Sequence, residues 1–211
     1  MSGGGGRDLE AARRLFAGSC EFVWGTGNIE SLPPPTLNEA AFVGRSNAGK
    51  SSLINALTNR KALARVSHTP GRTREINFFD LAGRLMLADL PGYGYARASK
   101  SLSAEWQRLI FAYLRGRPNL RRVMLLVDSR RGLMETDRAA MDLLDEAAVS
   151  YVVVLTKIDE LKREEFARVA SAVESETRQH TAAFPDLFAT SAHAKDGLDT
   201  VKVHLAALAS P

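Results

Sequence analysis

Apolar runs of strand length alternate with segments of helical periodicity along most of the chain. The strand-like runs lie at residues 40–43, 74–81, 85–90, 123–127, 149–155 and 187–190. The helix-like segments lie at residues 51–57, 102–115, 136–147, 163–180 and 198–209. This alternation is typical of an α/β fold in which helices cover both faces of a sheet. We therefore predict a three-layer sandwich around a six-stranded, mostly parallel sheet.

Two of the strand-like runs are too close together to be joined by a crossover helix. Residues 74–81 and 85–90 are connected through Ala82 and Gly83, so we expect an antiparallel hairpin that places one antiparallel strand at the sheet edge. The runs VMLLVD and YVVVLTK are instead continuously apolar. Such runs are typical of parallel strands that are buried on both faces.

The N-terminal part has a different character. MSGGGG cannot bury apolar surface and is expected to be disordered, and a short amphipathic stretch follows at residues 9–16. The three prolines of ESLPPPTLNEA exclude helix and sheet interior, which indicates a surface connector. We expect a flexible extension over residues 1–21 and a single domain over residues 22–211.

Composition narrows the functional classes. The chain has 211 residues, 45% of them hydrophobic, but no apolar run approaches the roughly 18–20 residues of a membrane helix. No export signal is recognisable either, so we expect a cytoplasmic protein without a membrane partner. Cys20 is the only cysteine, which excludes an internal disulfide and a thiolate metal cluster. The net charge of +4 is compatible with a polyanionic partner but does not require one.

The stretch FVGRSNAGKSSLINAL contains the pattern G-x-x-x-x-G-K-S between a predicted strand and a predicted helix. In this Walker A arrangement, backbone N–H groups and a helix N-terminus surround a phosphate chain. Lys50 can reach the terminal phosphates, and the Ser51 hydroxyl can ligate Mg²⁺. The predicted phosphate-binding residues are Gly44, Arg45, Ser46, Asn47, Ala48, Gly49, Lys50 and Ser51.

A second motif, DLPG, follows the strand-like run 85–90. Asp89 is expected at the carboxyl edge of the sheet, where it can hold a water on Mg²⁺, and the Gly92 amide can reach the γ-phosphate. Leu90 and Pro91 complete this predicted nucleotide-binding segment.

Two further strand ends predict which base is bound. In LTKID, Asp159 can accept hydrogen bonds from the N1–H and 2-amino groups of guanine, and adenine lacks both donors in that arrangement. A buried Asp159 would therefore be left unpaired against ATP. Lys157 is expected to lie along the base, and backbone N–H groups of ATSA can donate to the guanine 6-oxo group. The predicted base-binding residues are Thr156, Lys157, Ile158, Asp159, Thr190, Ser191 and Ala192.

The stretches GRSNAGKSSLINAL, TPGRTREINFF, DLPGYGYA and LTKID resemble most closely the EngB family of TRAFAC-class GTPases. The resemblance implies a GTPase fold with sheet order 2-3-1-4-5-6 and a site for GTP or GDP with Mg²⁺. It also implies association with the large ribosomal subunit, through rRNA and ribosomal proteins, and a link to cell division and septation.

A polar segment, ARVSHTPGRTREI, lies where a nucleotide-dependent switch is expected. A threonine in it can complete the Mg²⁺ shell when the γ-phosphate is present. The residues alone leave Thr69 and Thr73 open, and the resemblance selects Thr73. The predicted nucleotide-binding residues here are Gly71, Arg72, Thr73, Arg74 and Glu75. The resemblance thus implies catalytic roles for Lys50, Thr73 and Gly92 and metal binding by Ser51, Thr73 and Asp89.

Tyr93 and Thr156 depart from the commonest GTPase pattern, and Asn47 has two possible roles. Tyr93 stands where signalling GTPases have the glutamine that orients the attacking water, which predicts slow unaided hydrolysis. Asn47 can help to hold K⁺ near the phosphates or can simply stabilise the loop backbone. Thr156 replaces the usual asparagine and is expected to lose that amide's hydrogen bonds to the loop.

A basic segment follows the DLPG motif, with aromatic residues near it in sequence. It contains Arg97, Lys100, Arg108, Arg115, Arg117, Arg121, Arg122, Arg130 and Arg131, with Tyr93, Tyr95, Trp106 and Tyr113. Arginines with aromatics can contact rRNA phosphates and stack on bases, although a solvated helix face has the same composition. The histidines lack metal-ligand spacing and receive no catalytic role; they are His68, His180, His193 and His204.

The sequence thus predicts a monomeric GTPase that binds the large ribosomal subunit in its GTP state. Two alternatives stay open. One is a nucleotide-gated binding module with negligible turnover, and the other is an ATP-dependent P-loop enzyme, which Asp159 disfavours.

Overall fold

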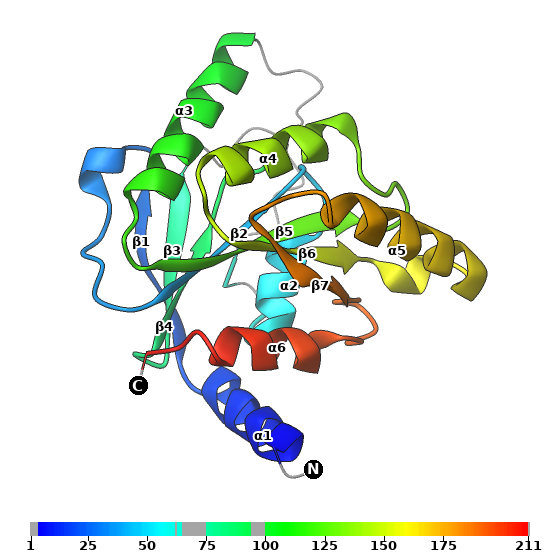
Figure 1. Ribbon diagram of the computed structural model, residues 1–211. Helices are drawn as coiled ribbons and strands as arrows, with labels where there is room; N and C mark the ends of the chain where they lie inside the picture. The colour runs from blue at the N-terminus through cyan, green and yellow to red at the C-terminus, as the bar shows by residue number, and fades with distance from the viewer. Residues whose placement is uncertain (1–3, 62, 65–74, 94–99, 211) are drawn as a thin grey trace.

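One sheet between two layers of helices forms the framework of the computed structural model, which describes residues 4–61, 63–64, 75–93 and 100–210 (Figure 1). Within these residues the sheet order is β1-β3-β4-β2-β5-β6-β7. The strands are β1 Cys20–Thr26, β2 Glu39–Gly44, β3 Ile76–Leu81, β4 Leu85–Asp89, β5 Leu120–Asp128, β6 Tyr151–Thr156 and β7 Ala183–Ala189.

The continuously apolar runs are parallel central strands, as predicted. β2 pairs in parallel with β4 and β5, and β6 pairs in parallel with β5 and β7. Successive side chains of a strand point to opposite faces, so Phe42 and Val154 enter one core while Val43 and Leu155 enter the other. Both faces are therefore buried, which explains why these strands lack an alternating polar pattern.

The helices cover the two faces in separate groups. Buried residues of α2 Lys50–Leu57 and α6 Leu198–Ala206 belong to one core. Those of α3 Lys100–Gly116, α4 Glu135–Glu146 and α5 Arg163–Thr177 belong to the other. Two short 3₁₀ helices, η1 Ile29–Ser31 and η2 Ile158–Glu160, lie in the connections. The predicted three-layer α/β sandwich is confirmed.

The predicted hairpin is also confirmed. β3 and β4 pair antiparallel, and Ala82 and Gly83 of the turn have left-handed φ values of 55° and 66°. Asp80 stabilises the turn because its Oδ1 accepts the Gly83 N–H at 2.7 Å. The order of the six expected strands, β3-β4-β2-β5-β6-β7, is the predicted 2-3-1-4-5-6 order.

The N-terminal part differs from the flexible extension that the sequence suggests for residues 1–21. Residues 4–17 form α1 Gly4–Ala17, whose Ala12, Leu15 and Phe16 are buried. Arg13 of α1 also forms an ion pair of 2.6 Å with Asp199 of α6. The apolar stripe of the amphipathic stretch is therefore buried against the main core, and the packing shows no division at residue 21.

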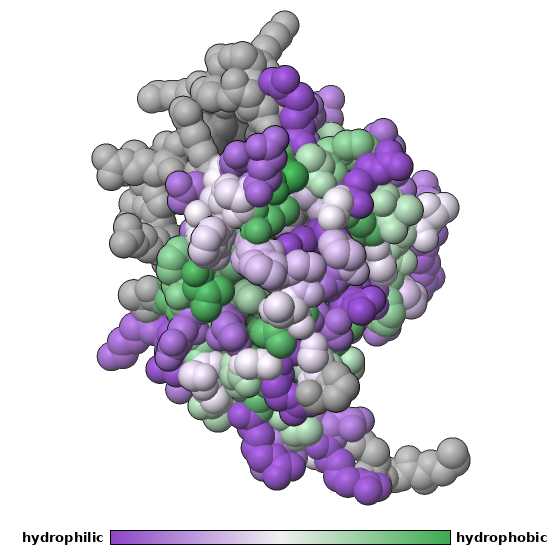
Figure 2. Space-filling view, turned by 90° about the vertical axis from the view of Figure 1, so that its left-hand side faces the viewer, coloured by the Kyte–Doolittle hydropathy of each residue, from purple (hydrophilic) through white to green (hydrophobic). Residues whose placement is uncertain are grey.

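A seventh strand is the second difference. β1 pairs antiparallel with β3, so β3 is an inner strand and β1 forms the edge. Its pattern does not signal a strand because five of its seven residues are exposed. Phe22, Val23 and Trp24 are 57%, 43% and 46% exposed. Figure 2 looks onto this side of the molecule, where hydrophobic patches interrupt a hydrophilic surface.

None of the helices in the described ranges has the length and apolar character needed to cross a membrane.

Candidate active site

The loop between β2 and α2 is built around unusual backbone geometry. Gly49 has a φ of 91° and Asn47 a φ of 66°, both in the left-handed region. A side chain at Gly44 would place its Cβ 2.8 Å from the Leu126 carbonyl oxygen, which belongs to a rigid neighbouring strand. The glycines of the G-x-x-x-x-G-K-S pattern are therefore required by the fold itself.

Asn47 has a clear backbone role. Asparagine tolerates the left-handed region better than most residues, and the Asn47 carbonyl oxygen accepts a hydrogen bond from Lys157 Nζ at 2.7 Å. This geometry accounts for the asparagine through loop structure, and K⁺ binding stays a prediction.

Lys50 and Ser51 begin α2 at the mouth of the loop. The Lys50 ammonium donates to Asp89 Oδ1, and the two side chains are only 11% and 6% exposed. Asp89 is the last residue of β4, at the carboxyl edge of the sheet as predicted. A helix N-terminus, a lysine and a glycine-rich loop together create a region that favours a phosphate chain.

The DLPG segment lies directly against this loop. Tyr93 N–H donates to the Gly44 carbonyl oxygen at 3.2 Å, and Ser46 N–H donates to the Tyr93 carbonyl oxygen at 2.9 Å. A Cβ at Gly92 would lie 3.3 Å from Ser46 N, so a side chain here would be tight and glycine is favoured. Leu90 N–H, in turn, donates to the Phe42 carbonyl oxygen at 3.0 Å.

The side chain of Tyr93 is directed into the protein. Its hydroxyl donates to Asp137 Oδ1 at 2.8 Å, and the residue is 7% exposed. Burial, and next the nearby Asp137 charge, raise the pKa of the phenol well above its usual value. Since this hydroxyl is hydrogen-bonded to α4, it does not replace the glutamine that orients water in signalling GTPases.

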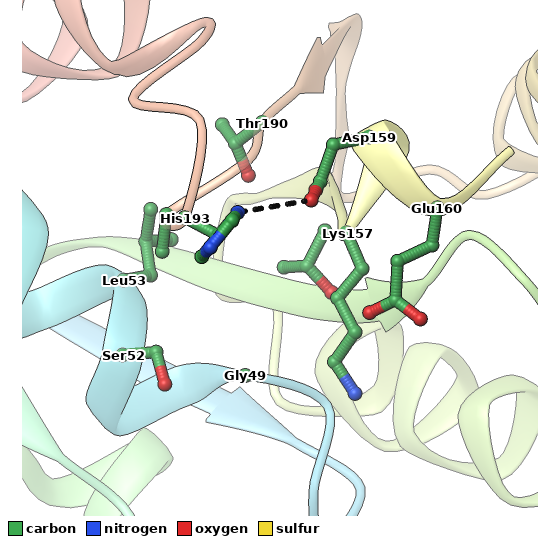
Figure 3. A pocket seen from close by; sticks show the side chains of 10 residues that line it. Gly49, Ser52, Leu53, Lys157, Asp159, Glu160, Thr190 and His193 are labelled. Carbon is green, nitrogen blue, oxygen red and sulfur yellow. Dashed lines mark ion pairs between the residues drawn. The ribbon is translucent and has the colours of Figure 1, made fainter.

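A pocket of about 410 Å³ opens beside the phosphate loop (Figure 3). Its walls come from the start of α2 and from the ends of β6 and β7. The lining residues are Gly49, Ser52, Leu53, Thr156, Lys157, Asp159, Glu160, Thr190, Ala192 and His193. The strand ends predicted to bind the base therefore meet the phosphate loop around one hollow.

Asp159 lies at the mouth of this pocket and not in the buried position that the sequence argument assumed. The residue is exposed, and a hydrogen bond from the Ser191 side chain is the main cause that lowers the pKa of its carboxyl group. His193 faces it, with 3.6 Å between His193 Nδ1 and Asp159 Oδ2 (Figure 3). The carboxylate is therefore ionised and preoriented, and any cost of desolvation arises only when a base covers it.

The expectation that Thr156 loses the hydrogen bonds to the phosphate loop is also corrected. Its buried hydroxyl donates to the Ala48 carbonyl oxygen at 2.6 Å, so the threonine does reach the phosphate loop. A hydroxyl has a single proton, and this contact uses it. The shorter threonine side chain therefore makes a hydrogen bond to the loop in place of the one that an asparagine side chain would make.

Lys157 is held between the loop and Asp128. Its Nζ lies 2.9 Å from Asp128 Oδ2 as well as 2.7 Å from the Asn47 carbonyl oxygen. Burial alone would raise the pKa of Asp128, but hydrogen bonds from Arg130 and Lys157 outweigh it and lower the pKa to about 2. Asp128, which sequence reasoning missed, therefore fixes the lysine that borders the base pocket.

The ATSA segment supplies fewer free backbone donors than expected. Ser191 N–H donates to the Asp196 carbonyl oxygen at 3.0 Å, and the Thr190 N–H donates to the Leu155 carbonyl oxygen at 2.7 Å. Ala192 lines the pocket and is thus the better placed donor for a 6-oxo group. Ser191 contributes through its side chain instead.

Four lining residues were not predicted from the sequence: Ser52, Leu53, Glu160 and His193. Ser52 and Leu53 directly follow the phosphate loop, and Glu160 and His193 directly follow the base motifs. Their proximity to the motifs was the available signal, but only the folded chain shows which neighbours face the hollow.

The predicted switch residues Gly71, Arg72, Thr73 and Arg74 lie outside the described residues, as does the alternative Thr69. Glu75 is described and exposed, just before β3.

Several residues of the basic segment have structural roles. Arg117 is buried and pairs with Glu39 at 2.9 Å, and the buried Tyr113 hydroxyl donates to the same carboxylate. Arg121 donates to Asn38 Oδ1 at 2.9 Å, and Arg122 donates to Ser150 Oγ at 2.6 Å. The exposed arginines of this segment in the described part are Arg108, Arg115, Arg121, Arg130 and Arg131. Arg97 and Tyr95, and the side chains of Lys100 and Trp106, lie outside the described part.

Comparisons with known proteins agree with this geometry. A family model described as "50S ribosome-binding GTPase" matches residues 39–157, and one described as "Elongation factor Tu GTP binding domain" matches residues 114–210. The sheet order, the phosphate loop and these matches define a P-loop GTPase.

Two relatives identify the family of P-loop GTPases to which the chain belongs. "Probable GTP-binding protein EngB" of Rhodospirillum rubrum is 56% identical over 97% of this chain and 91% of its own length. The protein of the same name from Granulibacter bethesdensis is 53% identical over 95% and 90%. The chain therefore belongs to the EngB family of GTP-binding proteins, as its motifs indicated.

Solved structures confirm the fold. A crystal structure of a probable GTP-binding protein EngB superimposes with a TM-score of 0.62 at 24% identity, over 81% of this chain and 97% of that chain. Elongation factor SelB of Methanococcus maripaludis, in complex with the GTP analogue GPPNHP, gives a TM-score of 0.57 at 22% identity over 81% and 33%.

Proposed function

We propose that this chain is a monomeric, cytoplasmic GTPase that assists assembly of the large ribosomal subunit and is gated by its nucleotide. The pocket between Asp159 and the phosphate loop is the observation that carries the guanine-nucleotide part of the proposal. The ribosomal part is supported by the description of the matched family model and by the resemblance to EngB proteins.

Mg²⁺ would be held by Ser51 and, through water, by Asp89. Both residues offer the oxygen ligands that this cation prefers, and the Asp89 carboxylate already lies beside the α2 N-terminus through its contact with Lys50. The bound cation would neutralise charge that develops between the β- and γ-phosphates. Thr73 would complete the shell when the γ-phosphate is present.

The chain's own residues carry the remaining chemistry. Lys50 and the loop amides stabilise negative charge on the transferred phosphoryl group, while the Gly92 amide binds the γ-phosphate. Because Tyr93 is bonded to Asp137, no side chain at that position orients the attacking water. We therefore propose slow unaided hydrolysis, which a ribosomal partner accelerates, with K⁺ near Asn47 as a further candidate activator.

Contact with rRNA would involve the exposed arginines. Arg108 and Arg131 are exposed, and Arg115 lies 5.5 Å above the centre of the Phe111 ring. Such residues can bind phosphates and stack on bases. The buried Arg117 is not part of this proposal because it holds Glu39 inside the fold. The link to cell division and septation stays a prediction from the resemblance.

Co-sedimentation with purified ribosomal subunits tests the partner and the gating together. We expect the protein to pellet with large subunits when a non-hydrolysable GTP analogue is bound, and to stay in the supernatant with GDP. Small subunits serve as the control. Equal pelleting in both nucleotide states would refute nucleotide gating.

Phosphate release separates an enzyme from a binding module with negligible turnover. It is measured with and without large subunits, in buffers that contain K⁺ or Na⁺. Stimulation by subunits or by K⁺ supports the GTPase cycle, and no stimulation in any condition supports the module. Competition by ATP as effective as that by GTP would instead support an ATP-dependent enzyme.

A further inference from the structure

The phenol of Tyr93 connects the DLPG segment with the N-terminal end of α4. Its hydroxyl donates to Asp137 Oδ1 at 2.8 Å, and Asp137 Oδ2 accepts the Met134 N–H at 2.9 Å. Tyr93 and Asp137 are only 7% and 1% exposed. Because both side chains are buried, loss of the phenol hydrogen bond would leave one oxygen of the Asp137 carboxylate without a partner. Breaking this hydrogen bond is therefore costly in free energy.

The backbone of the same tyrosine is bonded to the phosphate loop. Gly44 accepts its N–H and Ser46 donates to its carbonyl oxygen, at 3.2 and 2.9 Å. A Cβ at Gly92 would meet Gly44 O at 3.2 Å and Ser46 N at 3.3 Å, so Gly92 packs tightly against the loop. Tyr93 thus connects Gly92 to the phosphate loop through backbone hydrogen bonds and to α4 through the hydrogen bond of its side chain.

Arg45 connects the loop to the same pair electrostatically. Burial raises the pKa of both Tyr93 and Asp137, and the positive charge of Arg45 opposes this effect at each group. The tyrosine and the aspartate are therefore close enough to the phosphate loop for a loop charge to act on both.

We propose that Asp137 is a positioning residue of the GTPase site, which acts through the Tyr93 hydroxyl to hold the Gly92 amide where the γ-phosphate of GTP binds. Because GDP has no γ-phosphate, the hydrogen bond between Tyr93 and Asp137 favours GTP over GDP. By reciprocity, the γ-phosphate stabilises this position of the α4 N-terminus. The proposal rests on the guanine-nucleotide site alone and not on the ribosomal partner.

Equilibrium binding of fluorescent GDP and of a fluorescent non-hydrolysable GTP analogue tests the proposal, with Mg²⁺ present. Tyr93→Phe and Asp137→Ala should each lower the ratio of GTP-analogue affinity to GDP affinity by about fivefold, the value of one net hydrogen bond. The double variant should also lose about fivefold and not about twenty-fivefold, because both changes remove the same contact.

Asp137→Asn is the matched control. Its amide oxygen can accept the Met134 N–H while its NH₂ group donates to the phenol oxygen, so a hydrogen bond to Tyr93 is kept in the reverse direction and the affinity ratio should fall less than in Tyr93→Phe. Thermal unfolding of each variant checks the fold, and Tyr93→Phe with Asp137→Asn suffices if Asp137→Ala does not fold.

Three results would overturn the proposal. They are an unchanged affinity ratio in Tyr93→Phe, an equal loss of affinity for both nucleotides, and a ratio in Asp137→Asn as low as that in Tyr93→Phe. If neither nucleotide binds the wild-type protein, the nucleotide site itself is wrong, which is a distinguishable failure.

Discussion

At the phosphate end of the site the decisive groups belong to the backbone, whereas at the base end they belong to side chains. Gly44, Gly49 and Gly92 allow close approaches and a left-handed turn that present N–H groups. At the base end, Thr156 and Lys157 are held by side-chain hydrogen bonds, and Asp159 lies 3.6 Å from His193 Nδ1. The geometry of the phosphate end therefore depends on the absence of side chains, whereas that of the base end depends on a network of polar side chains.

Asp159→Asn should produce the largest effect, because it removes a charged acceptor of two hydrogen bonds from the base. We expect GDP affinity to fall about a hundredfold or more, since each hydrogen bond to a charged group contributes about 1.5–3 kcal/mol. Titration with fluorescent GDP measures the loss. Xanthosine diphosphate, whose 2-oxo group can accept from the new amide, should bind the variant better than GDP does.

Glu160→Gln is the control for that experiment. Glu160 also lines the pocket but is exposed and pairs with Arg130, so its loss should change GDP affinity by less than about twofold. Equal effects of the two substitutions would contradict recognition of the base by Asp159.

Gly44→Ala should distort the phosphate-binding loop through a steric clash alone. The new Cβ would lie 2.8 Å from the Leu126 carbonyl oxygen, which a buried strand holds in place. We expect the free energy of unfolding to fall by about 1–3 kcal/mol and GDP affinity to fall about tenfold. Denaturant titration and nucleotide binding measure the two effects.

Gly116→Ala is the matched control, because an added Cβ at this last residue of α3 meets nothing within 4 Å. This variant should be neutral or slightly more stable, since alanine has a higher helix propensity. If both variants behaved alike, the close approach at Gly44 would have no structural importance.

Asp128→Asn should weaken the network at the base end in a pH-dependent way. The folded-state pKa of Asp128 is lowered from 3.8 to about 2, so its ionised form stabilises the native protein above the unfolded-state pKa. That stabilisation, about 2 kcal/mol, should be about half lost by pH 3 and lost further as the pH falls through 2.

The difference in unfolding free energy between wild type and Asp128→Asn, measured from pH 6 down to pH 3, checks this sign. The difference should shrink as the pH falls. Glu174→Gln, which breaks an exposed pair with Arg178, provides the comparison, and its difference should stay below about 1 kcal/mol throughout. A constant difference for Asp128→Asn would exclude the proposed ion pair.

Thr156→Val should have the smallest effect. It removes the hydroxyl that donates to the Ala48 carbonyl oxygen but keeps the shape of the side chain. One net hydrogen bond contributes about 1 kcal/mol, so GDP affinity should fall by no more than about fivefold. Thr156→Ser, which keeps the hydroxyl, should restore most of it, and failure to do so would indicate packing instead of hydrogen bonding.

Most of the fold was predictable because its signals are local. Continuous apolar runs such as that of β6 are typical of parallel strands, and the short connection at Ala82 and Gly83 requires a hairpin. α1 was assigned to a flexible extension, and β1, most of which lies in the predicted domain 22–211, was not recognised as a strand. β1 exposes five of its seven residues, so only its hydrogen bonds to β3 reveal it as a strand.

For the site, the sequence by itself determined which chemistry is available: the glycine spacing of residues 44–51, the lysine beside it, and carboxylates at the ends of strands. These signals are local because each depends on backbone conformation or on the end of one strand. Tertiary structure alone decided which side chains meet. Asp128 reaches Lys157 from another strand, and Tyr93 reaches Asp137 of α4, 44 positions away in the chain. Such contacts leave no periodic trace in the sequence, because they depend on the packing of elements that are distant along the chain.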